Sequence, residues 1–144
     1  EFLEKYTPVA KTIAENGKYF MFHNHDSEFI RSGDKIVLEQ IAEALPAEQL
    51  GFILDTFWIQ AGGGDPAYWV ERFAGRVPCI HLKDYAYGRK MAVIGEGNIN
   101  FERVFAAAER AGTKYMLVEQ DDCNGEDPFV CLKRSFEYLR ACGF

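Results

Sequence analysis

Short apolar runs alternate with longer amphipathic stretches along this chain, and the alternation occurs four times. The apolar runs have the length of buried strands, whereas the amphipathic stretches repeat their apolar residues with helical spacing. Strands that alternate with helices are typical of a parallel sheet covered by helices. The pattern predicts strands at 19–23, 51–55, 77–82 and 115–119 and helices at 2–15, 35–45, 65–75, 101–110 and 127–142. Because no linker or composition break interrupts this order, we expect one α/β domain over residues 1–144.

Polar residues that can bind a metal ion stand at the end of every predicted strand. These residues are His23, Asp55, His81 and Glu119. A single histidine or aspartate at such a position is more often structural, but four at equivalent positions favour a shared site. The carboxyl ends of parallel strands lie at one edge of a sheet, so the four side chains are expected to converge there. Two imidazoles and two carboxylates suit one divalent ion, with manganese first and cobalt, zinc or iron as alternatives.

The period of two along a strand extends this prediction to neighbouring positions. Two residues before each ligand position stands an apolar residue that is expected to face the interior: Met21, Ile53, Cys79 and Leu117. Two residues after each position stand side chains that are expected to line the rim of the same pocket: His25, Phe57, Lys83 and Asp121.

Charge and composition narrow the class of protein. The net charge of −6 argues against a nucleic-acid groove, because phosphate binding relies on clustered lysine and arginine. No apolar run approaches the roughly 18 residues that span a membrane. The first predicted helix lacks the features of a signal peptide, and no CxxC pair occurs among the four cysteines. We therefore expect a cytoplasmic protein with reduced thiols.

Several stretches of the chain resemble a known family. The segments FHNHDSEF, GFILDTFW, CIHLKDY, IGEGNINF and VEQD are similar to those of the xylose-isomerase-like TIM barrels. This superfamily includes sugar phosphate isomerases and epimerases, inosose dehydratases and the family 2 apurinic (AP) endonucleases. The resemblance runs from the first helix to the last and matches the fifth to eighth βα units. It implies an α/β fold of four βα units, equivalent to the second half of a (β/α)8 barrel, whose complete form has about 250 residues.

The resemblance also implies roles for individual residues. The family's metal ligands map onto His23, Asp55, His81 and Glu119, with Lys83 and Glu96 near the site. The implied function is a metal-dependent sugar or cyclitol isomerase or epimerase that acts through a metal-bound enediolate, with dehydration as a close variant. Glu119 would move the proton, and His25 or Lys83 would assist at a substrate oxygen.

Two departures from the family pattern leave alternatives open. The epimerases carry a catalytic glutamate at the position of His23, and Glu28 could replace it from the loop or could bond the nearby backbone. Trp58 stands where many members carry a histidine, which argues against a trinuclear zinc endonuclease. This tryptophan could stack on a sugar face or pack on a neighbouring loop.

A second function remains possible for a chain of this length. Four βα units leave two open sheet edges and an uncovered inner face. The alternative is an inactive or incomplete half-barrel that binds metal without turnover and forms a homodimer or pairs with an N-terminal half-barrel. The glycine-rich segments Gly62–Gly64 and Gly95–Gly97 are expected to be turns, and a phosphate cradle at the first of them is the lesser alternative.

Overall fold

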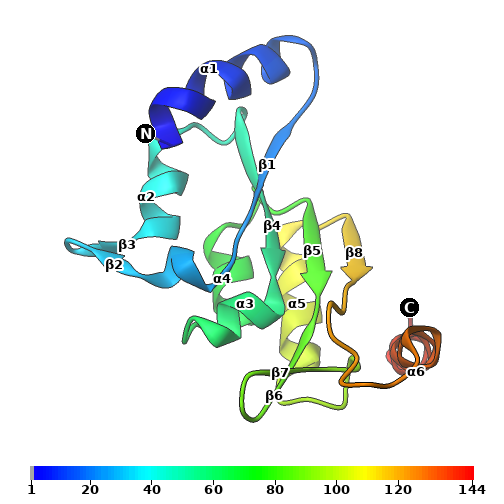
Figure 1. The fold of residues 1–144 in the computed structure, drawn as a ribbon. Helices are drawn as coiled ribbons and strands as arrows, with labels where there is room; N and C mark the ends of the chain where they lie inside the picture. Colours follow the sequence, from blue (N-terminus) through cyan, green and yellow to red (C-terminus); the bar gives the residue numbers. More distant parts are fainter. Residues whose placement is uncertain (1) are drawn as a thin grey trace.

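A parallel sheet of four strands forms the centre of the computed structural model, which describes residues 2–144 (Figure 1). In sheet order, the strands are β1 (Phe20–His23), β4 (Leu50–Asp55), β5 (Cys79–Leu82) and β8 (Tyr115–Val118). Every pair of neighbours is parallel, with Asp55 opposite His81 in the register between β4 and β5. Strand order therefore follows chain order, as expected for half of a (β/α)8 barrel, and the predicted strands are confirmed.

Five of the helices described in residues 2–144 connect and flank these strands close to the predicted positions. They are α1 (Phe2–Glu15), α2 (Val37–Ala44), α4 (Pro66–Arg72), α5 (Phe101–Ala111) and α6 (Pro128–Ala141). Two of these helices have an aspartate as their N-cap. Asp65 accepts a hydrogen bond from Ala67 N at 3.0 Å at the start of α4, and Asp127 accepts one from Phe129 N at 2.8 Å at the start of α6. Among the helices described in residues 2–144, none is long and apolar enough to cross a membrane.

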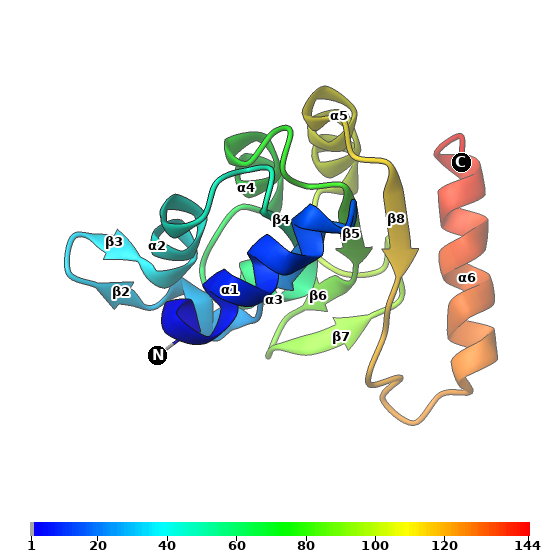
Figure 2. The same cartoon turned by 90° about the horizontal axis from the view of Figure 1, so that it is seen from above.

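The helices cover one face of the sheet. Figure 2 shows α2, α4 and α5 in an arc on one side, with α6 beside the β8 edge. The strand residues that face these helices are almost fully buried: Phe52, Leu54, Ile80 and Leu82. The alternate residues face the other side, where Met21 is 36% and Leu117 is 51% exposed. The sheet is thus buried on its outer face and open on the face that would be the inside of a barrel.

Two short hairpins and one short helix were not predicted from the sequence. Residues 35–36, assigned to a helix, instead form strand β3 (Lys35–Ile36), which pairs with β2 (Arg31–Ser32). The predicted loop after β5 contains a second hairpin, β6 (Asp84–Ala86) and β7 (Lys90–Ala92), and residues 56–61 form helix α3 rather than a loop. The two hairpins turn at glycines with positive φ, Gly33 at 73° and Gly88 at 77°. Such local pairs are too short to leave a periodic pattern in the sequence.

Candidate metal centre

The four strand-end residues converge at the carboxyl edge of the sheet. One ligand atom from each of the four lies within 4.8 Å of all the others: His23, Asp55, His81 and Glu119. Parallel strands with aligned register bring these positions together, although they are up to 96 residues apart in the chain. The predicted cluster is therefore present as a group that could hold a metal ion.

Asp55 lies at the centre of the cluster and is held from two sides. Its Oδ1 accepts a hydrogen bond from Trp58 N at 3.1 Å and so caps helix α3, whereas its own N–H donates to the buried side chain of Asn24 at 3.0 Å. The other oxygen, Oδ2, lies 3.4 Å from His23 Nε2 and 4.0 Å from His81 Nδ1. The carboxylate is fully buried, and such a charge is costly unless a cation or several donors compensate it.

Two atoms of the cluster are buried without a hydrogen-bond partner. His81 Nδ1 and Glu119 Oε2 lie 2.7 Å apart, yet their geometry is not that of a hydrogen bond. Buried polar atoms normally have well-aligned partners, so these two atoms are left with unmet hydrogen-bonding capacity. Metal–ligand bonds of about 2.1 Å place tetrahedral ligands about 3.4 Å apart, and the Asp55 distances of 3.4 and 4.0 Å are near that spacing. The residues therefore fit a shared divalent ion.

Lys83 adds a buried positive charge beside the cluster. Its Nζ lies 2.6 Å from Asp121 Oδ2, 3.4 Å from Glu119 Oε2 and 3.5 Å from Asp55 Oδ2. Burial acts to lower the pKa of Lys83, but the hydrogen bond to Asp121 and the two other carboxylates outweigh it, so the pKa is raised. The Thr56 hydroxyl donates to the Lys83 carbonyl at 2.8 Å, which fixes the end of β5. Lys83 is thus held as an ammonium group that can donate hydrogen bonds.

Aromatic side chains form the rim next to the cluster. The ring of His25 is exposed and lies 5.0 Å from the Trp58 ring. Lys83 Nζ lies 5.4 Å from the centre of the Trp58 ring, and the Arg89 guanidinium lies 5.9 Å from the same ring. This tryptophan therefore packs against the β6–β7 hairpin, which carries Arg89. Its buried Nε1 has no hydrogen-bond partner in the protein. The rim therefore carries an exposed imidazole beside an indole ring whose N–H is buried and unpaired.

Two residues with expected site roles are bonded elsewhere. The carboxylate of Glu28 accepts a hydrogen bond from His25 N at 2.6 Å and one from Ser27 Oγ at 2.8 Å. Of the two interpretations of this residue that the sequence left open, the structure therefore shows the bond to the nearby backbone. Glu96 forms an ion pair with Arg134 of α6 at 2.9 Å. Both side chains are committed to stabilising loops in this structure.

Asp84 was not identified from the sequence, although it organises the loop beside the centre. Its buried carboxylate accepts hydrogen bonds from the backbone N–H groups of Tyr85, Gly95, Gly97 and Ile99. Burial raises the pKa of Asp84, and the four backbone donors act in the opposite direction. The only sequence signal was the Lys-Asp pair after β5 together with the later Gly-Glu-Gly, and nothing in the sequence joined them.

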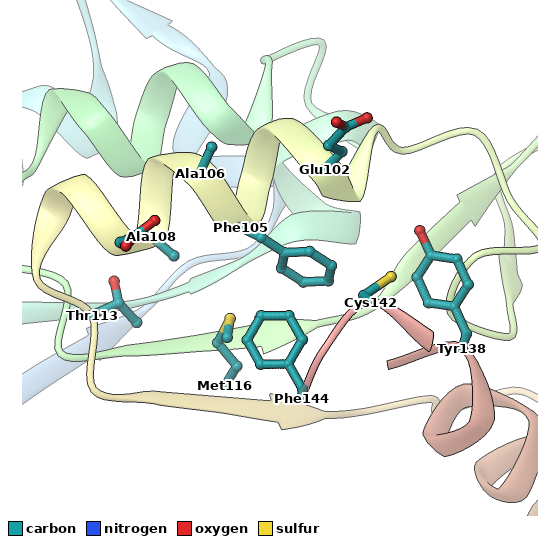
Figure 3. Close-up of a pocket in the computed structure, with 10 residues that line it drawn as sticks. Glu102, Phe105, Ala106, Ala108, Thr113, Met116, Tyr138, Cys142 and Phe144 are labelled. Carbon is teal, nitrogen blue, oxygen red and sulfur yellow. The ribbon is translucent and has the colours of Figure 1, made fainter. Parts of the chain in front are cut away.

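A cavity of 740 Å³ lies away from the cluster, on the helix-covered side of the sheet. Figure 3 shows it between α5, β8 and the end of α6, with the rings of Phe105 and Phe144 side by side and Tyr138 at the other end. Most of its lining is apolar, and none of the four clustered ligand residues lines it. This cavity is therefore separate from the candidate metal centre.

The fold and the site together define the class of protein. Four parallel βα units carry histidine and carboxylate side chains at their carboxyl edge, where TIM-barrel enzymes have their active sites. The model of the xylose isomerase-like TIM barrel family matches residues 1–142, and the chain belongs to that family.

Individual relatives agree with this assignment, and this chain covers only part of the length of each. The chain is 22% identical to an inosose dehydratase of Bacillus cereus over 90% of this chain and 47% of the relative. A sugar phosphate isomerase/epimerase from Parabacteroides distasonis superposes with a TM-score of 0.78 at 25% identity, over 94% of this chain and 51% of the other. An L-ribulose 3-epimerase shares the fold, with a TM-score of 0.71 at 16% identity. The match covers 93% of this chain and 50% of the other. The chain spans about half the length of the curated relatives that it matches.

Proposed function

We propose that the chain, as one domain over residues 1–144, forms the metal-binding half of an isomerase or epimerase that acts on a sugar or cyclitol. Dehydration is a close variant, because loss of water from the same intermediate differs only in what is protonated. The observation that carries the proposal is the cluster of two imidazoles and two carboxylates within 4.8 Å, next to the buried Lys83. The likeness to an inosose dehydratase and the fold shared with an L-ribulose 3-epimerase support it.

The reaction needs a proton to leave a carbon next to a carbonyl group and to return to a different position. A divalent ion bound by the cluster would polarise the carbonyl and acidify that C–H bond. Glu119 is the candidate base, since its side chain is 37% exposed at the strand end while its Oε2 reaches the cluster. Lys83, held as an ammonium group, would donate a hydrogen bond to the oxygen that becomes negative in the enediolate.

A single carboxylate is left for proton transfer in this proposal. Glu28, the alternative acid or base, is bonded to His25 N and Ser27 Oγ. His25 is exposed at the rim, 5.0 Å from the His23 ring, and is the candidate group for the second proton or for a substrate hydroxyl. Trp58, whose ring lies 5.0 Å from that of His25, would contribute a ring contact to the substrate.

Metal binding by the intact protein tests the proposal first. Calorimetric titration of the metal-free protein with manganese chloride, and separately with zinc chloride, is expected to give one ion per chain. The bound ion should raise the melting temperature, because it binds the folded state alone. Addition of a chelator should reverse the shift. Absence of stoichiometric binding with either ion would remove the basis of the proposed function.

The open inner face favours a second candidate, a half-barrel that pairs with another half. The exposed apolar side chains on this side include Met21, Tyr115 and Leu117. Contiguous apolar surface of this kind is unusual on a soluble monomer. Two copies related by a two-fold axis could pair edge to edge into eight strands, and an N-terminal half-barrel would cover the same face.

Light scattering at micromolar concentration measures this association. We expect a mass of twice the 16.4 kDa chain. Leu117→Asp should shift the protein toward monomer, because it places a charge in the proposed interface. Tyr87→Asp, at a 92% exposed position of the β6–β7 turn, serves as the control and should leave the mass unchanged. A sharp peak at the single-chain mass for the wild-type protein would contradict pairing between copies.

A further inference from the structure

Two of the four cysteines lie close together where the loop after β8 meets α6. All four are free thiols: Cys79, Cys123, Cys131 and Cys142. Cys123 belongs to the loop and is partly exposed, whereas Cys131 belongs to the first turns of α6 and is only 1% exposed. One member of this pair is therefore reachable from solvent and the other is not.

A tight turn directs Cys123 back toward the helix. Glu126 N donates a hydrogen bond to Cys123 O at 3.0 Å, and the two residues between them, Asn124 and Gly125, have positive φ angles of 51° and 88°. Two consecutive residues with positive φ are typical of a type I′ turn, for which Asn-Gly is a preferred pair. In Figure 2 the loop leaves β8, turns back and enters α6. The residue before the turn is thus brought beside the residues that follow it.

The side chain of Cys123 lies against the side of α6 that carries Cys131. A small cavity of 180 Å³ is lined by Val118, Gln120, Cys123, Pro128 and Leu132. Pro128 stands three positions before Cys131 on the helix, and residues at that spacing share a face. The cavity is large enough to hold several molecules of the size of water. A small oxidant can therefore reach the Cys123 thiol at this junction.

The two thiols are close enough to interact. Burial raises the pKa of the Cys131 thiol, and a hydrogen bond with the Cys123 thiol raises it further. Cys131 thus stays protonated at neutral pH. The rate at which a cysteine reacts depends on its accessibility as well as on its thiolate fraction. Cys123 is therefore the thiol that meets an oxidant first, with Cys131 beside it.

Cys131 is also one of the few residues that hold α6 in place. The helix has 14 residues, and only Cys131 and Ser135 among them are buried. Arg134 adds ion pairs with Glu96 and Glu126, and ion pairs at a protein surface contribute little to stability. A covalent bond at Cys131 would therefore change how firmly α6 is held.

We propose that Cys123 and Cys131 form a redox-active dithiol, which a hydroperoxide converts into a disulfide that fastens α6 to the loop after β8. The Cys123 sulfur attacks one peroxide oxygen, so an S–O bond forms, the O–O bond breaks, and water or an alcohol leaves. The Cys131 sulfur then displaces the hydroxyl group of the sulfenic acid. The S–S bond forms, the S–O bond breaks, and the thiol proton leaves with the hydroxyl group as water. The two sulfurs together lose two electrons, which the peroxide takes up.

Treatment of the purified protein with hydrogen peroxide, followed by alkylation and digestion with trypsin, tests the inference. Cleavage after Lys114 and Lys133 gives one peptide that contains both cysteines. We expect this peptide to lose two hydrogen atoms and to resist alkylation until dithiothreitol is added. The inference is overturned if both thiols remain open to alkylation after millimolar peroxide. Recovery of Cys123 as a sulfinic acid without the disulfide would overturn it as well.

Single substitutions assign the two roles. Cys131→Ser removes the second thiol, so the sulfenic acid of Cys123 should accumulate and be trapped by dimedone. Cys123→Ser leaves only the buried thiol, which should resist the same treatment. Cys142→Ser is the matched control, because it removes an exposed thiol at the other end of α6 and should leave the yield of the disulfide unchanged. Loss of the disulfide in this control, or rapid oxidation of Cys131 in Cys123→Ser, would contradict the assigned roles.

The fastening of α6 has its own measurement. A disulfide that closes a short loop restricts the unfolded chain, so the melting temperature of the oxidised protein should lie roughly 5 °C above that of the reduced protein. Dithiothreitol should reverse the rise, and peroxide-treated Cys131→Ser should show none. An unchanged or lower melting temperature in the disulfide form would show that the bond does not fasten the helix.

Discussion

Replacement of Asp55 by alanine is expected to abolish stoichiometric metal binding. The Oδ2 atom of Asp55 lies 3.4 Å from His23 Nε2 and 4.0 Å from His81 Nδ1, so this side chain joins the two imidazoles of the centre. Mutation of residues that only support the ligands of a metal site lowers the metal affinity about 10–100-fold. Removal of one of the four ligands themselves is expected to lower it further. The measurement is the metal content of protein dialysed against manganese, by atomic absorption. His81→Ala should have the same effect.

Stability must be separated from metal binding in this experiment, because Asp55 also caps helix α3. Loss of an aspartate cap costs about 1 kcal/mol. Asp65→Ala is the matched control, since it removes the cap of α4 and should leave the metal content unchanged. Circular dichroism should show that both variants are folded. If Asp55→Ala and His81→Ala both retain the wild-type metal content, the ion is bound elsewhere.

The second large effect is expected for Glu119→Gln, which should lose most turnover in the assembled, active protein. A proton-transfer group contributes roughly 10²–10⁴-fold to the rate, and glutamine cannot accept the proton. The fold should be retained, because Glu119 is a partly exposed side chain at the end of a strand. Initial rates at saturating substrate, measured over a range of manganese concentrations, give the size of the loss.

The manganese series distinguishes a base from a ligand. If Glu119 acts as the base, excess manganese should not restore the rate of the glutamine variant. Recovery of the wild-type rate at high manganese would leave Glu119 as a metal ligand only. Asp122→Asn is the control within the same loop, and its rate is expected to stay near that of the wild-type protein.

The sequence by itself determined the strands, the long helices and the cluster at the strand ends. Strand alternation with a period of two, together with parallel pairing, is enough to place His23, Asp55, His81 and Glu119 at one edge. The apolar residues two positions earlier indicated which face of each strand belongs to the inside of the barrel. These inferences succeed because each depends on local periodicity and on one topological rule, and neither requires a knowledge of side-chain contacts.

Tertiary structure alone decided how the remaining polar groups are used. The partner of Glu96 is Arg134, 38 residues away, and that of Arg89 is Asp26, 63 residues away. The carboxylate of Asp84 could have been a metal ligand or a rim residue, and only the path of the loop shows that it binds the N–H groups of Gly95, Gly97 and Ile99. The physical reason is that a charged side chain takes the partner that the folded chain brings within about 3 Å, and that proximity depends on loop conformations which no local pattern encodes.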